Sequence, residues 1–114
     1  MATPESKVKA DVEKQLFIWG FIKAGTKECN WPARPSGWYY MPVQTGYGVN
    51  GIPDFICQHK GYFFAIETKA PGKLKSLSVN QERRIKEITT GYGTVFVVDS
   101  AEMLAKEFEA WLCS

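Results

Sequence analysis

The sequence predicts a single α/β domain, residues 1–114, in which helices flank a mixed β-sheet. Its 114 residues match the size of one domain, and 45% of them are hydrophobic, which is enough for a packed core. Helical patterns occupy both ends of the chain, and a β-hairpin pattern lies in the middle. A helical segment separates the hairpin from a last apolar strand, and such a crossover makes the last strand parallel to the one before it. The expected element order is αβββαβα.

The first part of the chain predicts a helix, two loops and a short strand. A helix is expected over residues 6–24, with Gly25 as its stop, because apolar side chains recur there at spacings of three and four. Pro, Gly and Asn within residues 26–37 predict a loop. The aromatic run "WYYMPV" at residues 38–43 favours a short strand, and the glycine-rich residues 44–51 predict a second loop. The apolar stripe of the helix comprises Val8, Val12, Leu16, Trp19 and Ile22.

The second part predicts a hairpin, a helix, a strand and a last helix. The arms "PDFICQH" and "YFFAIETKA" flank Lys60-Gly61, which fits a two-residue turn. A basic loop at residues 71–76 follows, and Ser78 and Gln81 then have the spacing of a capping box, which predicts a helix start near Ser78. Residues 94–98 form an apolar strand pattern, and residues 101–112 carry apolar side chains at helical spacing.

The two-residue turn determines which residues of the hairpin lie opposite each other. Counting outward from the pair of His59 and Tyr62, Asp54 falls opposite Glu67. Directly opposed residues share one face of a sheet, with Cβ atoms roughly 4.5–5.5 Å apart. Lys69 lies two residues beyond Glu67 and therefore on the same face. The expected pairs in between are Gln58 with Phe63, Cys57 with Phe64, Ile56 with Ala65, and Phe55 with Ile66.

This patch of two carboxylates and one ammonium favours a site for a divalent cation. Like charges in contact are destabilising unless something compensates them, and Mg²⁺ suits one or two protein carboxylates together with water and substrate phosphate. The structural alternative is that Asp54 caps the strand start, while Glu67 and Lys69 form an ion pair on a solvated face. The same face also carries Ile56 and Ala65, so it is expected to be half covered, where unpaired charges are costly.

The combination resembles the PD-(D/E)XK nuclease superfamily, and more closely its VRR-NUC branch. The resemblance covers nearly the whole chain and implies a restriction-endonuclease-like fold. The long aromatic segment between residues 31 and 49 does not match the family pattern. The matching parts are "DVEKQL" (11–16), "GIPDF" (51–55), "AIETKAPGK" (65–73), Gln81 and "GTVFVVDS" (93–100).

The resemblance implies a role for each residue of the hairpin site. Asp54 and Glu67 would bind Mg²⁺ or Mn²⁺, with the backbone carbonyl of Thr68 as a third ligand. Lys69 would orient or activate the attacking water and stabilise charge that develops on the phosphate.

The two flanking helices supply further candidates. Glu13 would reach the metal from the first helix, where Asp11 and Glu5 are its rivals. Gln81 would face the site from the second helix, because it shares one helical face with Ile85. The alternative is that Gln81 only closes the capping box.

Basic residues near the hairpin and the second helix predict contacts with DNA phosphates. The formal net charge is only +2, so nucleic-acid binding would depend on a local patch. The alternative is that they form a solvated helix face. Tyr39, Tyr40 and Tyr47 are candidates to stack on bases or to pack a dimer. The expected DNA-binding residues are Lys60, Lys73, Lys75, Arg83 and Arg84.

Other classes have less support. Three cysteines at irregular spacing predict no disulfide framework and suit a reducing cytosol. Cys57 and His59 lack a second ligand pair for zinc. The chain opens without a signal-peptide pattern, and its apolar runs are shorter than the roughly 20 residues of a membrane span. A cytoplasmic protein without a membrane partner is therefore expected, and the small free-standing form of the family it resembles suggests a bacterial or phage origin.

The expected function is that of a Mg²⁺- or Mn²⁺-dependent endonuclease that hydrolyses phosphodiester bonds in DNA. By analogy with the family, a compact stand-alone domain suggests a homodimer that cuts paired strands of branched DNA, such as Holliday junctions. One alternative is a restriction- or repair-type nuclease that acts on linear or flap DNA. The other is a non-catalytic DNA-binding module.

Overall fold

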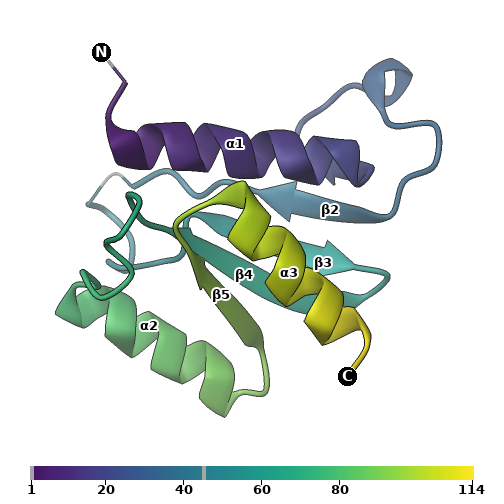
Figure 1. Ribbon diagram of the computed structural model, residues 1–114. Helices are drawn as coiled ribbons and strands as arrows, with labels where there is room; N and C mark the ends of the chain where they lie inside the picture. The colour runs from purple at the N-terminus through teal and green to yellow at the C-terminus, as the bar shows by residue number, and fades with distance from the viewer. Residues whose placement is uncertain (1, 45) are drawn as a thin grey trace.

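A five-stranded mixed sheet forms the middle layer of the computed structural model, which describes residues 2–44 and 46–114. Helices α1 and α3 cover one face of the sheet, and α2 lies on the other (Figure 1). The predicted α/β class, with helices on a mixed sheet, is confirmed. The elements are α1 (Pro4–Ile18), β1 (Phe21–Lys23), a 3₁₀ turn (Glu28–Asn30), β2 (Gly37–Tyr40), β3 (Phe55–His59), β4 (Tyr62–Thr68), α2 (Val79–Thr90), β5 (Thr94–Val98) and α3 (Ala101–Leu112).

The strands follow the order β1-β2-β3-β4-β5 across the sheet. The two central pairs, β2 with β3 and β3 with β4, are antiparallel. The two outer pairs, β1 with β2 and β4 with β5, are parallel. The parallel pairing of β4 and β5 across the α2 crossover confirms the predicted connection. The predicted loop at residues 44–51 includes Thr45, which lies outside the described residues.

The first helix is shorter than the predicted span of residues 6–24, and the predicted end is wrong. Thr3 and Ser6 form a capping box, and Pro4 stands in the first turn, so α1 starts early. The chain leaves the helix at Gly20, whose φ is +87° and where a Cβ would press on the Arg34 carbonyl. Residues of the predicted helix end instead form β1, an edge strand that the helical spacing of the apolar residues concealed.

The hairpin has the register that its turn predicts. Lys60 and Gly61 have φ values of 51° and 89°, and positive φ at both central residues is the signature of a type I′ turn. All five pairs from His59 with Tyr62 to Phe55 with Ile66 are present.

The core lies between the sheet and the layer of α1 and α3. Val12, Leu16, Phe55, Phe64 and Leu104 are fully buried there. Burying side chains of this size contributes about 1.5–3 kcal/mol each, so this face anchors the fold. Helix α2 has no fully buried residue and packs on the other face, beside β5. No helix in the described part of the chain is long and apolar enough to span a membrane.

The loop before β3 packs tightly on the start of α2. Gly51 has a φ of +86°, and a Cβ there would collide with the backbone of Asn80 and with the amide nitrogen of Gln81. A glycine is therefore required on two grounds, the left-handed conformation and the close approach. This contact ties the residues that precede Asp54 to the first turn of α2.

We expect Gly51→Ala to lower the free energy of unfolding by at least about 2 kcal/mol, because backbone strain and a backbone clash add together. Gly25→Ala is the matched control, since Gly25 has a φ of +86° but open space around it. That variant should lose only about 1 kcal/mol. Urea unfolding followed by circular dichroism measures both. Equal losses in the two variants would show that the contact with α2 contributes nothing.

Candidate active site at the ends of β3 and β4

Three consecutive polar residues are buried where β4 ends. Glu67, Thr68 and Lys69 have relative exposures of 2%, 1% and 6%, and no other polar or charged residue in the described chain is classed as buried. Burying such groups costs several kcal/mol unless they are paired or hydrogen-bonded. Their partners therefore define the site.

Asp54 is the first partner, and it takes the place of a strand neighbour. The ladder between β3 and β4 stops at the pair of Phe55 and Ile66. Beyond it, the Asp54 Oδ2 atom accepts hydrogen bonds from the backbone N–H of Thr68 at 2.9 Å and from its hydroxyl at 2.7 Å. The ammonium of Lys9, on α1, lies 3.7 Å from Oδ1 of the same carboxylate. Asp54 is thus fixed at the end of β4 by three groups.

Glu67 lies beside Asp54, as the hairpin register predicts. Burial, then the charge of Asp54 and a hydrogen bond with it, raises the pKa of Glu67 to about 8. The Lys69 ammonium acts in the opposite direction. The two carboxyl groups therefore lie within hydrogen-bond reach of each other, and near neutral pH Glu67 keeps its proton.

Lys69 is held on the same face by two acceptors. Its Nζ donates to Gln81 Oε1 at 2.8 Å and to the carbonyl of Ser76 at 3.3 Å. An ammonium has three donors, so these contacts leave one free for a further acceptor. The backbone of Lys69 is fixed as well, because its N–H donates to the carbonyl of Val98 at the end of β5.

Gln81 combines the two roles that the sequence left open. The side-chain Oε1 of Gln81 accepts a hydrogen bond from the backbone N–H of Ser78 at 2.9 Å. The backbone N–H of Gln81 donates to Ser78 Oγ at 3.1 Å, which completes the capping box. The same Oε1 accepts from Lys69. Since the capping box restricts the Gln81 side chain, the start of α2 determines where the lysine ammonium lies.

The carbonyl of Thr68 points toward the same space. In a strand, the N–H and C=O of one residue point to the same side, and the Thr68 N–H points away from β5 toward Asp54. Continuing the hairpin count places Pro53 opposite Thr68, and proline has no N–H to donate. This carbonyl therefore meets no backbone donor across the strand end.

Glu13 lies apart from this group. Its Oε2 accepts from the Tyr39 hydroxyl at 2.7 Å and pairs with the Lys23 ammonium at 2.8 Å, so the carboxylate is held beside β1 and β2. The carboxylate of α1 that raises the pKa of Glu67 is Glu5, two turns earlier on the same stripe. In the sequence, Glu5, Lys9 and Glu13 follow one another at intervals of four. This spacing could have indicated a charged stripe on one side of the helix.

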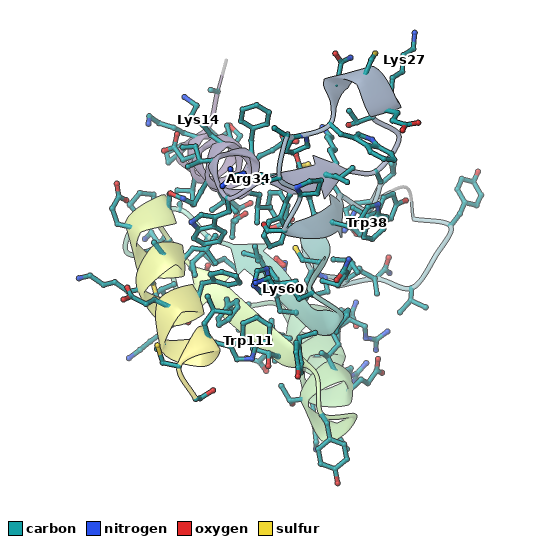
Figure 2. All side chains as sticks on the ribbon, turned by 90° about the vertical axis from the view of Figure 1, so that its right-hand side faces the viewer. Lys14, Lys27, Arg34, Trp38, Lys60 and Trp111 are labelled. Atoms are coloured by element: carbon teal, nitrogen blue, oxygen red, sulfur yellow. The ribbon has the colours of Figure 1, made fainter. Side chains whose placement is uncertain are left out.

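The predicted DNA-binding residues separate into two groups. Lys73 and Lys75 are exposed in the loop after β4, which is tied to the end of β5 by a hydrogen bond from Gly72 N–H to Asp99. Arg83 is exposed on α2. Lys60 lies at the hairpin turn, at the end of the sheet that faces the viewer in Figure 2, and roughly 20 Å along the strand from Asp54. Lys60 is therefore remote from the carboxylates.

Arg84, also on α2, is less exposed than the other predicted DNA-binding residues. Its side chain is 17% exposed, Nη2 lies 3.3 Å from Glu87, and Nε is buried without a partner in the described chain.

Donor chemistry at the site fits a hard divalent cation. Within residues 2–44 and 46–114, no three His, Cys, Asp or Glu side chains form a group that could hold a metal. The available donors are instead two carboxylates in contact and the Thr68 carbonyl, all oxygen atoms, which suit Mg²⁺ or Mn²⁺ with water and substrate oxygens. Repulsion within the pair would be relieved by such an ion.

Comparisons with protein-family models, curated proteins and solved structures found no match.

In the absence of metal, we expect Glu67→Gln to stabilise the protein increasingly as pH rises from about 5 to about 8. The folded pKa of Glu67 lies above its ordinary value of 4.5, so folding favours the protonated form, and wild-type stability is lost as pH rises toward 8. A glutamine carries no charge at any pH. The melting temperature of the variant should exceed that of wild type by roughly 10 °C at pH 8 and by little at pH 5.

Thermal melts in chelator at both pH values measure this difference. Glu13→Gln is the control, because the pKa of Glu13 is lowered and its charge is paired, so this variant should be destabilised. A Glu67→Gln advantage that is independent of pH would contradict a proton kept by Glu67 at the site.

Proposed function

We propose that the chain is a metal-dependent endonuclease that hydrolyses phosphodiester bonds in DNA. The observation that carries the proposal is the contact at the strand ends between the half-buried Asp54 carboxylate and the buried Glu67 carboxyl, with the Lys69 ammonium on the same face. Two carboxyl groups in contact at a largely buried site stabilise a fold less than apolar residues of similar size would. The resemblance of "GIPDF" and "AIETKAPGK" to the VRR-NUC branch of the PD-(D/E)XK nucleases supports the same proposal.

Each residue has a separable task in the reaction. When bound by Asp54, Glu67 and the Thr68 carbonyl, a divalent cation would neutralise charge on the phosphate. Lys69 has one ammonium donor left for the attacking water or a phosphate oxygen. The water oxygen bonds to phosphorus as the bond from phosphorus to O3′ breaks, and the proton lost by the water balances the one gained by the leaving oxygen.

Substrate and assembly follow from the family analogy. We propose branched DNA as the preferred substrate and a homodimer as the active form, so that two sites cut paired strands. A bacterial or phage-encoded protein of the cytoplasm fits this reading. A restriction- or repair-type nuclease on linear or flap DNA uses the same site and differs only in substrate shape.

A cleavage assay tests the reaction class. We expect supercoiled, flap or four-way-junction DNA to be cut with Mg²⁺ or Mn²⁺ and not with chelator. Asp54→Asn, Glu67→Gln and Lys69→Met should each lower the rate at least about 100-fold. Glu13→Gln is the matched carboxylate control and should stay within about fivefold of wild type, since Glu13 is held by Tyr39 and Lys23. Absence of cleavage with every metal and substrate would leave the non-catalytic DNA-binding module.

Gln81 offers a sharper test of how Lys69 is positioned. Gln81→Met removes the acceptor for the ammonium and should lower the cleavage rate about 10- to 100-fold. Ser78→Ala removes only the cap, so it should lower stability by about 1 kcal/mol and leave the rate nearly unchanged. Single-turnover rates and melting curves of both variants separate the two effects. Equal rate losses would show that α2 stability, and not the bond to Lys69, governs activity.

A further inference from the structure

The face of the sheet that carries the candidate site is only half covered. Glu67 and Lys69 lie on the side of α2, and α2 packs beside β5. Over the other half of this face, on β2 and β3, the described residues place no helix (Figure 1). Trp38 lies there, on the opposite side of the sheet from α3 and Trp111 (Figure 2).

Two aromatic rings stand side by side on this open half. Trp38 and Tyr40 alternate with the buried Tyr39 along β2, and they are 38% and 44% exposed. Their ring centroids are 6.4 Å apart, and their planes differ by 16°. This separation is close to the roughly 6.6 Å between alternate residues of a strand, so the two nearly parallel rings form one aromatic surface. The geometry suits a flat aromatic ligand that stacks on or between the rings.

The sheet register places these rings close to the carboxylates. Tyr40 pairs with Ile56, and Ile56 pairs with Ala65, so the three lie in one row across the sheet. Glu67 is the next residue on the same face of β4. Two strand spacings separate Tyr40 from β4, about 10 Å, which a few nucleotides bridge.

Basic side chains lie at the β5 end of this path. The loop with Lys73 and Lys75 is tied to Asp99 at the end of β5, on the far side of β4 from Tyr40. Arg84 lies on α2, where its side chain is 17% exposed and pairs with Glu87. A strand that passes from the basic loop over Glu67 to Tyr40 would therefore meet positive charge along its phosphates.

We propose that Trp38 and Tyr40 stack an unpaired base of the DNA substrate next to the bond that is cleaved. The inference rests on the proposed nuclease function and deepens it, because it assigns a substrate with a single-stranded segment, as flaps have. A second copy of the chain fits this patch less well. Trp38, Tyr40 and the 40%-exposed Phe63 together offer roughly 300 Å² of aromatic surface, against about 800 Å² per partner in a stable dimer.

Binding without cleavage provides the test. Fluorescence anisotropy in chelator would compare a labelled single-stranded 12-mer, the same chain without bases, and a blunt duplex. We expect Trp38→Leu and Tyr40→Leu to weaken binding of the 12-mer about tenfold each, because leucine keeps the strand apolar but cannot stack. Affinity for the abasic chain and the duplex should change less than twofold.

Two further variants make the comparison specific. Trp38→Phe should restore most of the affinity that Trp38→Leu loses, since a phenyl ring still stacks. Tyr62→Leu removes a 71%-exposed aromatic ring near the hairpin turn, remote from the site, and should leave binding unchanged. Thermal melts verify that every variant is folded.

Three results would overturn the inference. The first is that the leucine variants bind the 12-mer as tightly as wild type does. The second is that they lose as much affinity for the abasic chain as for the 12-mer. The third is that light scattering shows a wild-type dimer that the leucine variants no longer form, while their DNA affinity is unchanged. The last result would assign the face to contacts between copies. Because binding is measured without metal, it is independent of catalysis: ring-dependent binding without cleavage under any metal condition would sink only the nuclease function.

Discussion

The contact between the Asp54 and Glu67 carboxyl groups is the constraint that the surrounding structure serves. A buried and a half-buried carboxylate in contact repel each other, and the fold offsets this with the proton that Glu67 keeps, the Thr68 donors, the Lys9 ammonium and the nearby Lys69. These groups come from β3, β4 and α1, so the pair exists only in the folded chain. The carboxyl pair therefore favours the binding of a cation and adds little to the stability of the fold.

The second helix belongs to this site as much as to the fold. It buries no residue fully, so its packing on the sheet is weak compared with that of α1 and α3. Its first turn is nevertheless fixed twice, by the capping box of Ser78 and Gln81 and by the close approach of Gly51. Gln81, which closes the capping box, also contacts Lys69. Gly51 stands three residues before Asp54. The contacts that fix α2 are therefore at its N-terminal end, where the proposed chemistry would occur.

What the sequence could predict was local, and what it could not was set by distant contacts. The positive-φ turn at Lys60 and Gly61 determines the hairpin register, so the pairs from His59–Tyr62 to Phe55–Ile66 followed from counting. Asp54 comes next, beyond the end of the ladder, and lies beside Glu67. The capping box was equally readable. By contrast, β1 was hidden because Trp19 and Ile22 continue the helical period, and only the Arg34 carbonyl beside Gly20 shows why the helix ends. The partners of Glu13, which lie on β1 and β2, were hidden for the same reason.

The half-covered face explains how one sheet can hold both buried charges and an open surface. The 12-residue α2 packs beside β5, and its Gln81 contacts Lys69. Under the proposed function, this cover would give Glu67 and Lys69 a low-dielectric setting in which to act on a phosphate. The same helix leaves β2 and β3 open, so a substrate can approach along the sheet without displacing core residues, which lie on the other face. Covering the whole face would exclude a polymer, and exposing all of it would hydrate the carboxylates and weaken their hold on a cation. The narrow α2 layer meets both demands, and the exposed rings of Trp38 and Tyr40 stand where the cover ends.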